Sequence, residues 1–369
     1  MLLGSEISQM QIDIYCIKGF TGSALKDRLE HALIEDHIES EIHEVNSVDE
    51  FVRAGIYSVP AIRVGDKVFL HPQNGKIDET IDQVMDFIIK GSPPSILVPV
   101  DFSPESLHAV QYAAMMAEEL QLGLTLTHIH LPIYDPISGG ATDVLLQKEN
   151  AIQLHDLAEQ IRVDFKNRSV DLQVDVHLES GDPATNLIQL SASDHYKLVI
   201  MATKGRDTTF RRLFSTMTAR VGRHSHKPVL IVPPTGAISY PAKWLIGFDQ
   251  AWVDLGPTDS IWEFHTPAVK SMLFTHVINT QKPVDETVLK QFCQKIKRIE
   301  GKSTELKCES VQPLGKQVDD VLLDKARVAH ADLIVLFSQQ RSFMESLQHS
   351  SVIRKVIQQP PVPVLIFPL

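Results

Sequence analysis

Short runs of β-branched and other apolar residues alternate with longer amphipathic segments between residues 95 and 234. The runs have the length and composition of buried strands, and they are ILVPVD, LTLTHIHL, VDVHL, LVIMAT and PVLIVP. Between these runs lie three longer segments in which apolar residues recur at helical spacing. They are SLHAVQYAAMMAEEL, the stretch through AIQLHDLAEQIRVDF, and PATNLIQLSASDH. Because strand, helix and strand repeat, we expect right-handed crossovers and a doubly wound parallel sheet covered on both faces. This α/β pattern places a ligand beyond the carboxyl ends of the strands, where Asp101 follows the first run.

Two segments rich in proline and glycine divide the 369 residues of the chain. GSPP at 91–94 precedes the first strand-like run, and PPTGAISYPAK at 233–243 precedes a second run, WLIGFD, that also ends in an aspartate. We therefore predict three domains, which span residues 1–91, 95–234 and 237–369.

The second and third domains resemble each other in sequence. Three stretches align: LVIMATKGR with LIVLFSQQR (198–206 and 333–341), PVLIVP with PVLIFP (228–233 and 363–368), and ILVPVD with LIGFD (96–101 and 245–249). A duplication is the simplest explanation, so we refer to the two domains as the first repeat and the second repeat.

The segment from residue 10 to residue 91 has a different order of elements. Its pattern predicts a strand, a helix, a strand, a short helix, a hairpin and a last helix, in MQIDIYCI, SALKDRLEHALIED, SEIHEV, SVDEFVRAG, YSVPAIRVGDKVF and KIDETIDQVMDFIIK. This segment is also acidic, because residues 1–91 contain 16 acidic against 8 basic residues and hold most of the net charge of −11. An acidic N-terminal segment argues against a nucleic-acid partner, because it repels the phosphate backbone.

Composition narrows the class of protein further. With 43% hydrophobic and 22% charged residues the chain has material for several cores and no sign of disorder. No apolar run is long enough to cross a bilayer, and MLLGSEISQM lacks the basic and apolar regions of a signal peptide, so we expect no membrane partner and a cytoplasmic protein. Three widely spaced cysteines fit that expectation, and we interpret Cys16, Cys293 and Cys308 as buried packing residues.

The motifs of the first repeat resemble those of a known family. A first strand VPVD, a GDP before a helix, a strand ending in MATKG, nine further residues, a pair of hydroxyl residues and then HSHKPVLIVP are similar to the universal stress protein domain, which has the adenine-nucleotide alpha hydrolase-like fold. The resemblance covers residues 95–234 well and 243–369 more loosely. It implies a tandem protein of the stress response that binds ATP, ADP or AMP, with no metal beyond a nucleotide-associated Mg²⁺.

Nucleotide-binding members of that family carry Gly-x-x-Gly, nine residues, then Gly and Ser or Thr in the phosphate loop. The resemblance implies that these positions are Ala202, Gly205, Ser215 and Thr216, so one of three glycines remains. Glycines let backbone N–H groups converge on an anion, and the following helix adds a partial positive charge. Ala202 is compatible with such a loop at negative φ, and we expect Ser215 to be able to cap the helix. Basic side chains are available to neutralise phosphate or to form a solvated basic edge, and these are Lys204, Arg206, Arg211 and Arg212.

The second repeat departs further from the family pattern. The equivalent positions are Phe337, Gln340, Ser350 and Ser351, and no lysine replaces Lys204. Because large side chains intrude where backbone must approach phosphate, we expect this repeat to be degenerate.

Asp101 resembles the family's aspartate on the adenine side of the nucleotide, and Asp249 has the same place in the second repeat. Both also precede predicted helices, so helix capping is the alternative role.

The order of elements in residues 10–91 resembles a small thioredoxin-like domain, with YSVPAIRVGDKVF as its most specific part. The resemblance implies that Pro60 follows a cis bond and that Gly19 and Gly22 stand at the two cysteine positions, giving GFTG in place of CxxC. Thiol–disulfide exchange needs a thiolate at that helix, so we expect no redox activity and interpret Cys16 as a core residue.

Further polar clusters do not suggest catalysis. The pairs His128 with His130 and His224 with His226 lack a third metal ligand at recognisable spacing, and no nucleophile motif such as GxSxG occurs. No general base can be placed, so we predict no catalytic residues and leave hydrolysis of a bound ATP open.

The apolar closing strands of the two repeats resemble the pairing edges of the family, so we expect the repeats to pair within one chain. The alternative function is a protein-interaction module without a nucleotide, and a thiol oxidoreductase is a third, weaker alternative.

Overall fold

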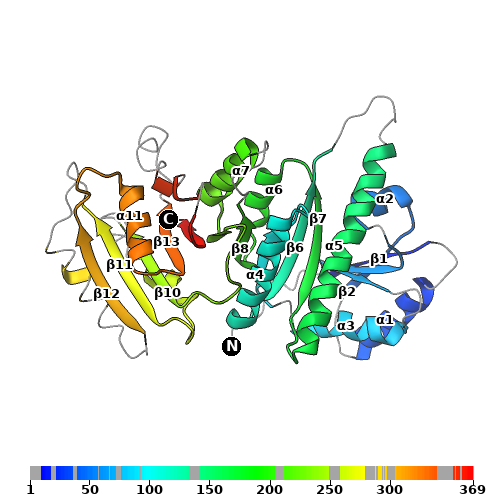
Figure 1. Cartoon of the computed structure of the whole chain (residues 1–369). Coiled ribbons are helices and arrows are strands. Elements are labelled where there is room, and N and C mark those ends of the chain that lie inside the picture. The colour runs from blue at the N-terminus through cyan, green and yellow to red at the C-terminus, as the bar shows by residue number, and fades with distance from the viewer. Residues whose placement is uncertain are drawn as a thin grey trace. The chain divides into compact units, whose positions relative to one another are not determined.

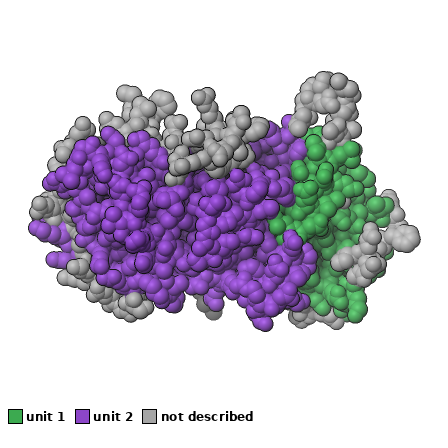
Figure 2. Space-filling model, viewed as in Figure 1, with its two compact units in different colours: residues 1–93, 133–158, 175–179 green, residues 94–132, 159–174, 180–369 purple. Residues whose placement is uncertain are grey.

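A computed structural model gives the architecture of the chain (Figure 1). It describes residues 10–17, 22–35, 40–56, 58–65, 67–71, 76–90, 93–132, 141–203, 211–248, 258–278, 287, 290–292, 294, 296, 304–338, 352–353, 355–357 and 360–368. These residues form two compact units (Figure 2), of which unit 1 comprises 1–93, 133–158 and 175–179, and unit 2 comprises 94–132, 159–174 and 180–369.

The N-terminal segment forms a four-stranded mixed sheet. Its elements are β1 (Met10–Tyr15), α1 (Gly22–Glu35), β2 (Ser40–Val45), α2 (Val48–Arg53), β3 (Ala61–Val64), β4 (Lys67–Leu70) and α3 (Ile77–Lys90), and the strand order is β2-β1-β3-β4. Strand β1 runs parallel to β2 and antiparallel to β3, and β3 and β4 form the expected hairpin. The Val59–Pro60 bond before this hairpin is cis. The predicted order of elements is therefore confirmed.

Alternation along β1 separates two apolar clusters on the faces of this sheet. Ile12 and Ile14 point to one face and pack with residues of α1 and α3 such as Leu29 and Val84. Tyr15 belongs to the other cluster, with Phe51 of α2. Because side chains alternate along a strand, one strand can serve both clusters.

The first repeat contains the elements that its periodicity predicts. They are β5 (Ser95–Pro99), α4 (Pro104–Leu120), β6 (Gly123–His130), α5 (Ala141–Asn167), β7 (Val174–Ser180), α6 (Pro183–Leu190), β8 (Tyr196–Ala202), α7 (Arg211–His224) and β9 (Val229–Val232). The described elements of the second repeat are β10 (Lys243–Phe248), α9 (Thr258–Trp262), β11 (Ser271–Val277), β12 (Glu305–Val311), α11 (Val318–Val328), β13 (Leu333–Ser338) and β14 (Val364–Pro368).

The strands of the two repeats form one ten-stranded sheet with the order β12-β11-β10-β13-β14-β9-β8-β5-β6-β7. Numbered within each repeat, both halves have the strand order 3-2-1-4-5. Within the two halves, parallel pairs form between β10 and β11, β10 and β13, β11 and β12, β13 and β14, β5 and β6, β5 and β8, and β8 and β9. This establishes the α/β fold with parallel sheets that we expected.

Strands β9 and β14 join the two halves as an antiparallel pair, in which Leu230 lies opposite Leu365. One apolar cluster continues across this seam, from Leu97 and Val199 of the first repeat to Ile334 and Ile366 of the second. Helices α6, α7 and α11 contribute to this cluster and therefore cover one face of the sheet. Met116 of α4 lines a small apolar cavity on the opposite face.

Candidate functional site

The strand order creates a topological switch point at the carboxyl ends of β5 and β8. These strands are neighbours and parallel, but the chain leaves β5 toward β6 on one side and leaves β8 toward β9 on the other. Ligands of doubly wound sheets bind in the crevice outside such strand ends. Asp101 lies just beyond β5, and Ala202 is the last residue of β8, so the fold brings two of the predicted site residues to the same switch point.

Asp101 is exposed and lies in the corner between β5 and α4. Its Oδ1 accepts hydrogen bonds from the backbone N–H of Ser103 (3.1 Å) and from the Ser103 hydroxyl (2.5 Å). Ser103 is the residue that caps α4, and its Oγ accepts from the N–H of Ser106. Asp101 therefore does not cap the helix itself, but it supports the residue that does.

The segment that the sequence predicts to be a phosphate loop connects β8 to α7. Lys204, Gly205 and Arg206 lie outside the described residues, so the structure gives no geometry for them. Helix α7 begins at Arg211, four residues before Ser215. Ser215 and Thr216 thus belong to the helix, and the expectation that Ser215 could cap it is wrong. The first turn of α7 starts with two arginines, Arg211 and Arg212, and contains no acidic residue.

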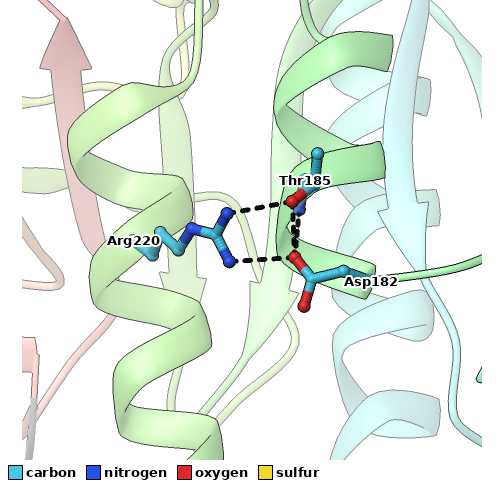
Figure 3. A network of polar contacts seen from close by, with 3 residues as sticks. All are labelled: Asp182, Thr185 and Arg220. Carbon is cyan, nitrogen blue, oxygen red and sulfur yellow. Dashed lines mark hydrogen bonds and ion pairs between the residues drawn. The ribbon is translucent and has the colours of Figure 1, made fainter.

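Polar contacts between α6 and α7 fix the helix that follows the loop (Figure 3). Asp182 caps α6 by accepting from the N–H (2.9 Å) and the hydroxyl (2.6 Å) of Thr185. Arg220 of α7 donates to Asp182 Oδ2 (2.9 Å) and to Thr185 Oγ1 (2.9 Å). The hydrogen bonds from Thr185 and then the charge of Arg220 hold the pKa of Asp182 below its ordinary value.

Sequence reasoning noticed the GDP that contains Asp182 but missed its partner Arg220. The two residues are 38 positions apart, and they meet only because α6 and α7 lie side by side. The N-cap pattern at Asp182 was the available signal for half of this network.

In the second repeat, aromatic side chains gather near the equivalent strand ends. The ring of Phe337, at the first glycine position, stacks on Phe367 with centroids 5.6 Å apart. Phe248, the last residue of β10, lies 5.0 Å from the buried ring of Phe292. Asp249 lies outside the described residues, as do the other equivalent loop positions Gln340, Ser350 and Ser351.

The N-terminal segment has no thiolate at the start of α1. Gly22, at the second cysteine position, is the first residue of α1, and a β-carbon placed there would overlap the sulfur of Cys16 and lie 2.6 Å from its Cβ. Burial and then the charge of Glu44 raise the pKa of Cys16, so its thiol stays protonated at neutral pH. Gly19, at the first cysteine position, lies outside the described residues.

Other chemistry is sparse in the part of the chain that the structure describes. There, no three His, Cys, Asp or Glu side chains gather as a metal site, and no helix is long and apolar enough to span a membrane. Cys308 is disulfide-bonded, so the interpretation of this cysteine as a packing thiol is wrong.

A parallel, doubly wound sheet with a topological switch point defines a class of α/β proteins, and ligands of that class bind outside the strand ends at the switch point. Within that class, the profile of the universal stress protein family matches residues 94–233 and 277–368, more than half of the chain. The chain belongs to the universal stress protein family and contains two domains of it.

Individual relatives are distant. A universal stress protein of Mycolicibacterium smegmatis is 24% identical over 305 residues, covering 73% of this chain and 96% of the relative. The structure of a universal stress protein from Archaeoglobus fulgidus superposes with a TM-score of 0.56 at 18% identity, covering 75% of this chain and 98% of that one. A universal stress protein solved in complex with cAMP also matches, with a TM-score of 0.31 at 22% identity, over 39% of this chain and 100% of that one.

Proposed function

We propose that this protein is a stress-response regulator that binds ATP or a related adenine nucleotide at the switch point of its first repeat. The observation that carries the proposal is the placement of Asp101 and the end of β8 at neighbouring strand ends, followed by a helix whose first turn is basic. A helix N-terminus attracts anions, and the sequence of this first turn adds the positive charges of Arg211 and Arg212.

In this proposal each predicted site residue has a role. Asp101 meets the base, and backbone N–H groups from Ala202 through Gly205 approach the phosphates. Lys204 neutralises phosphate charge, while Ser215 and Thr216 offer hydroxyl groups near the start of α7. Any Mg²⁺ arrives with the nucleotide, and we assign it no carboxylate ligand and assign the protein no catalytic residue.

Mass spectrometry of the nucleotide released on denaturing freshly purified protein tests the proposal, together with titration calorimetry using ATP and cAMP. We expect bound adenine nucleotide in the wild type and its loss in Gly205→Arg, because the arginine side chain obstructs the close approach of backbone to phosphate. A wild type that carries no nucleotide and binds neither probe would contradict the proposal.

A second candidate is a protein-interaction module without a nucleotide. The aromatic rings of Phe248, Phe292 and Phe367 are buried against neighbouring rings in the second repeat, so they are core residues and do not themselves form a docking surface. We assign residues 1–91 to a thioredoxin-like domain without redox activity, and residues 95–234 and 237–369 to the two stress-protein domains. The strand-helix-strand unit followed by a hairpin and a helix supports the first assignment. The raised pKa of Cys16 supports the absence of redox activity, and an insulin-reduction assay tests it. Activity that is lost in Cys16→Ser would contradict it.

We also propose that the two repeats form an intramolecular pseudo-dimer in the cytoplasm. The antiparallel pairing of β9 with β14 and the apolar cluster that crosses it support this assembly.

A further inference from the structure

Both repeats contain a Thr-His pair near the end of their second strand, at Thr127-His128 in β6 and Thr275-His276 in β11. Nδ1 of His128 lies 2.7 Å from the carbonyl oxygen of Val100, and Nδ1 of His276 lies 3.1 Å from that of Phe248. In both cases the histidine follows its carbonyl partner by 28 residues. The same contact has therefore been retained in both halves of the duplication.

The carbonyl partner has a defined place in each repeat. Val100 directly precedes Asp101, and Phe248 directly precedes Asp249. A carbonyl oxygen only accepts hydrogen bonds, so Nδ1 of each imidazole carries the proton. Each histidine thus donates to the last backbone group before a strand-end aspartate.

In the first repeat the histidine touches both neighbours of the aspartate. Besides donating to Val100, the His128 ring packs on Phe102 with centroids 5.2 Å apart and an angle of 33° between the planes. Phe102 has φ 60°, in the left-handed region that residues with a side chain rarely adopt. Such a conformation persists only where surrounding contacts hold it, and the ring contact with His128 is one of these.

The carboxylate of Asp101 is held on its other side by Ser103. Its Oδ1 accepts from the Ser103 N–H and hydroxyl, so the backbone at Val100, the backbone at Phe102 and the carboxylate itself are all constrained. Removal of His128 would release the first two constraints at once.

We propose that His128 is a positioning residue, which fixes the direction in which the Asp101 carboxylate leaves β5 and so presents it to a ligand donor at the switch point. This inference rests on the proposed nucleotide function, in which the donor is an amino group of the base. His276 holds the equivalent corner of the second repeat, where its Nε2 is buried without a hydrogen-bond partner among the described residues.

Two substitutions separate the two contacts of His128. His128→Asn keeps an N–H donor close to the position of Nδ1 and loses the ring, whereas His128→Phe keeps a ring against Phe102 and loses the donor. His276→Phe is the matched control, because it removes the same hydrogen bond from the second repeat.

Hydrogen exchange at the Ser103 amide gives a readout that needs no ligand, since this amide donates to Asp101. In His128→Phe we expect exchange to be roughly five- to tenfold faster and ATP to bind roughly five- to tenfold more weakly, as for the loss of one hydrogen bond. His128→Asn should restore part of both properties, and His276→Phe should leave both at wild-type values.

The outcomes distinguish the two proposals. If the wild type binds ATP but His128→Phe matches it in affinity and in Ser103 exchange, the positioning role is overturned. Equal effects of His276→Phe and His128→Phe also overturn it, because general destabilisation then explains them. If the wild type binds neither ATP nor cAMP, the proposed function fails, whatever the exchange rates are.

Discussion

Burial keeps two polar side chains of this protein uncharged, the imidazole of His128 and the thiol of Cys16. It lowers the pKa of His128 against the opposing effect of the hydrogen bond to Val100, and it raises the pKa of Cys16. At neutral pH the histidine is therefore a single N–H donor to the backbone, and the cysteine is a protonated thiol.

The lowered pKa of His128 predicts a pH dependence of stability. The unfolded chain takes up a proton on this residue as the pH falls past about 6.5, whereas the folded protein does so only at lower pH. Stability should therefore decrease below about pH 6.5 and level off below the folded-state pKa. Two neighbouring charged groups also act on the pKa of His128. The charge of His130 lowers this pKa, and the charge of Asp101 raises it.

Denaturant midpoints measured between about pH 7.5 and pH 5 check this prediction. His128→Phe should reduce the slope without removing it, since the pKa of His224 is also lowered by burial. An unchanged slope in His128→Phe would show that His128 titrates normally.

Gly22 is predicted to be intolerant of any side chain, because the side chain of Cys16 occupies the space of its β-carbon. Gly22→Ala should destabilise the N-terminal segment by about 1–3 kcal/mol, which is the usual range for overpacking. Thermal or chemical unfolding measures this loss. The double variant with Cys16→Gly should lose less stability than the sum of the single variants, and strict additivity would argue against the overlap.

At the level of secondary-structure elements, one residue, Asp182, links helices α6 and α7. Asp182 both caps α6 and pairs with Arg220, so the start of one helix is linked to the third turn of the next. This link holds α7 against α6.

Substitutions at Asp182 should separate its two roles. Asp182→Ala removes the cap and should cost about 1 kcal/mol of stability, whereas Asp182→Asn keeps a capping oxygen and should cost less. A double-mutant cycle of Asp182→Asn with Arg220→Met should give a coupling of about 0.2–1 kcal/mol that shrinks as salt is added. A coupling that does not respond to salt would mean that the interaction is not an ion pair.

Much of the fold could be predicted from the sequence, but fewer of the contacts at the candidate site could. Apolar periodicity identified β5, β6, β8 and β9, because it records which positions face a core. It does not record which polar groups meet across the structure. The capping of α4 by Ser103 in place of Asp101 depends on local turn geometry, and the bond of Arg220 to Asp182 depends on the packing of two helices.

The seam between β9 and β14 is the feature that joins the two repeats at the scale of the whole molecule. The pairing places Leu230 opposite Leu365, and both side chains line the same small apolar cavity. Ile366 belongs to the cluster on the other face of the sheet.

A pair of introduced cysteines tests this register in the intact chain. Residues directly opposite in an antiparallel pair have Cα atoms about 4.5–5.5 Å apart, within the range of a disulfide. Leu230→Cys with Leu365→Cys should therefore form an intrachain disulfide under mild oxidation, detected by peptide mass spectrometry. Leu230→Cys with Ile366→Cys should not, because a shift of one residue moves the side chain to the opposite face. Efficient bridging of the second pair instead of the first would contradict the register.

The covalent link between the two repeats has a consequence for subunit exchange. Edge strands that pair between separate chains can mix with the edges of any similar protein in the same cell. In the proposed pseudo-dimer, β9 would meet β14 of its own chain at an effective concentration of about millimolar, the usual value for short flexible tethers, and would outcompete a separate chain at lower abundance. Under that proposal the tandem arrangement would insulate this protein from forming mixed dimers and would leave its two halves free to diverge.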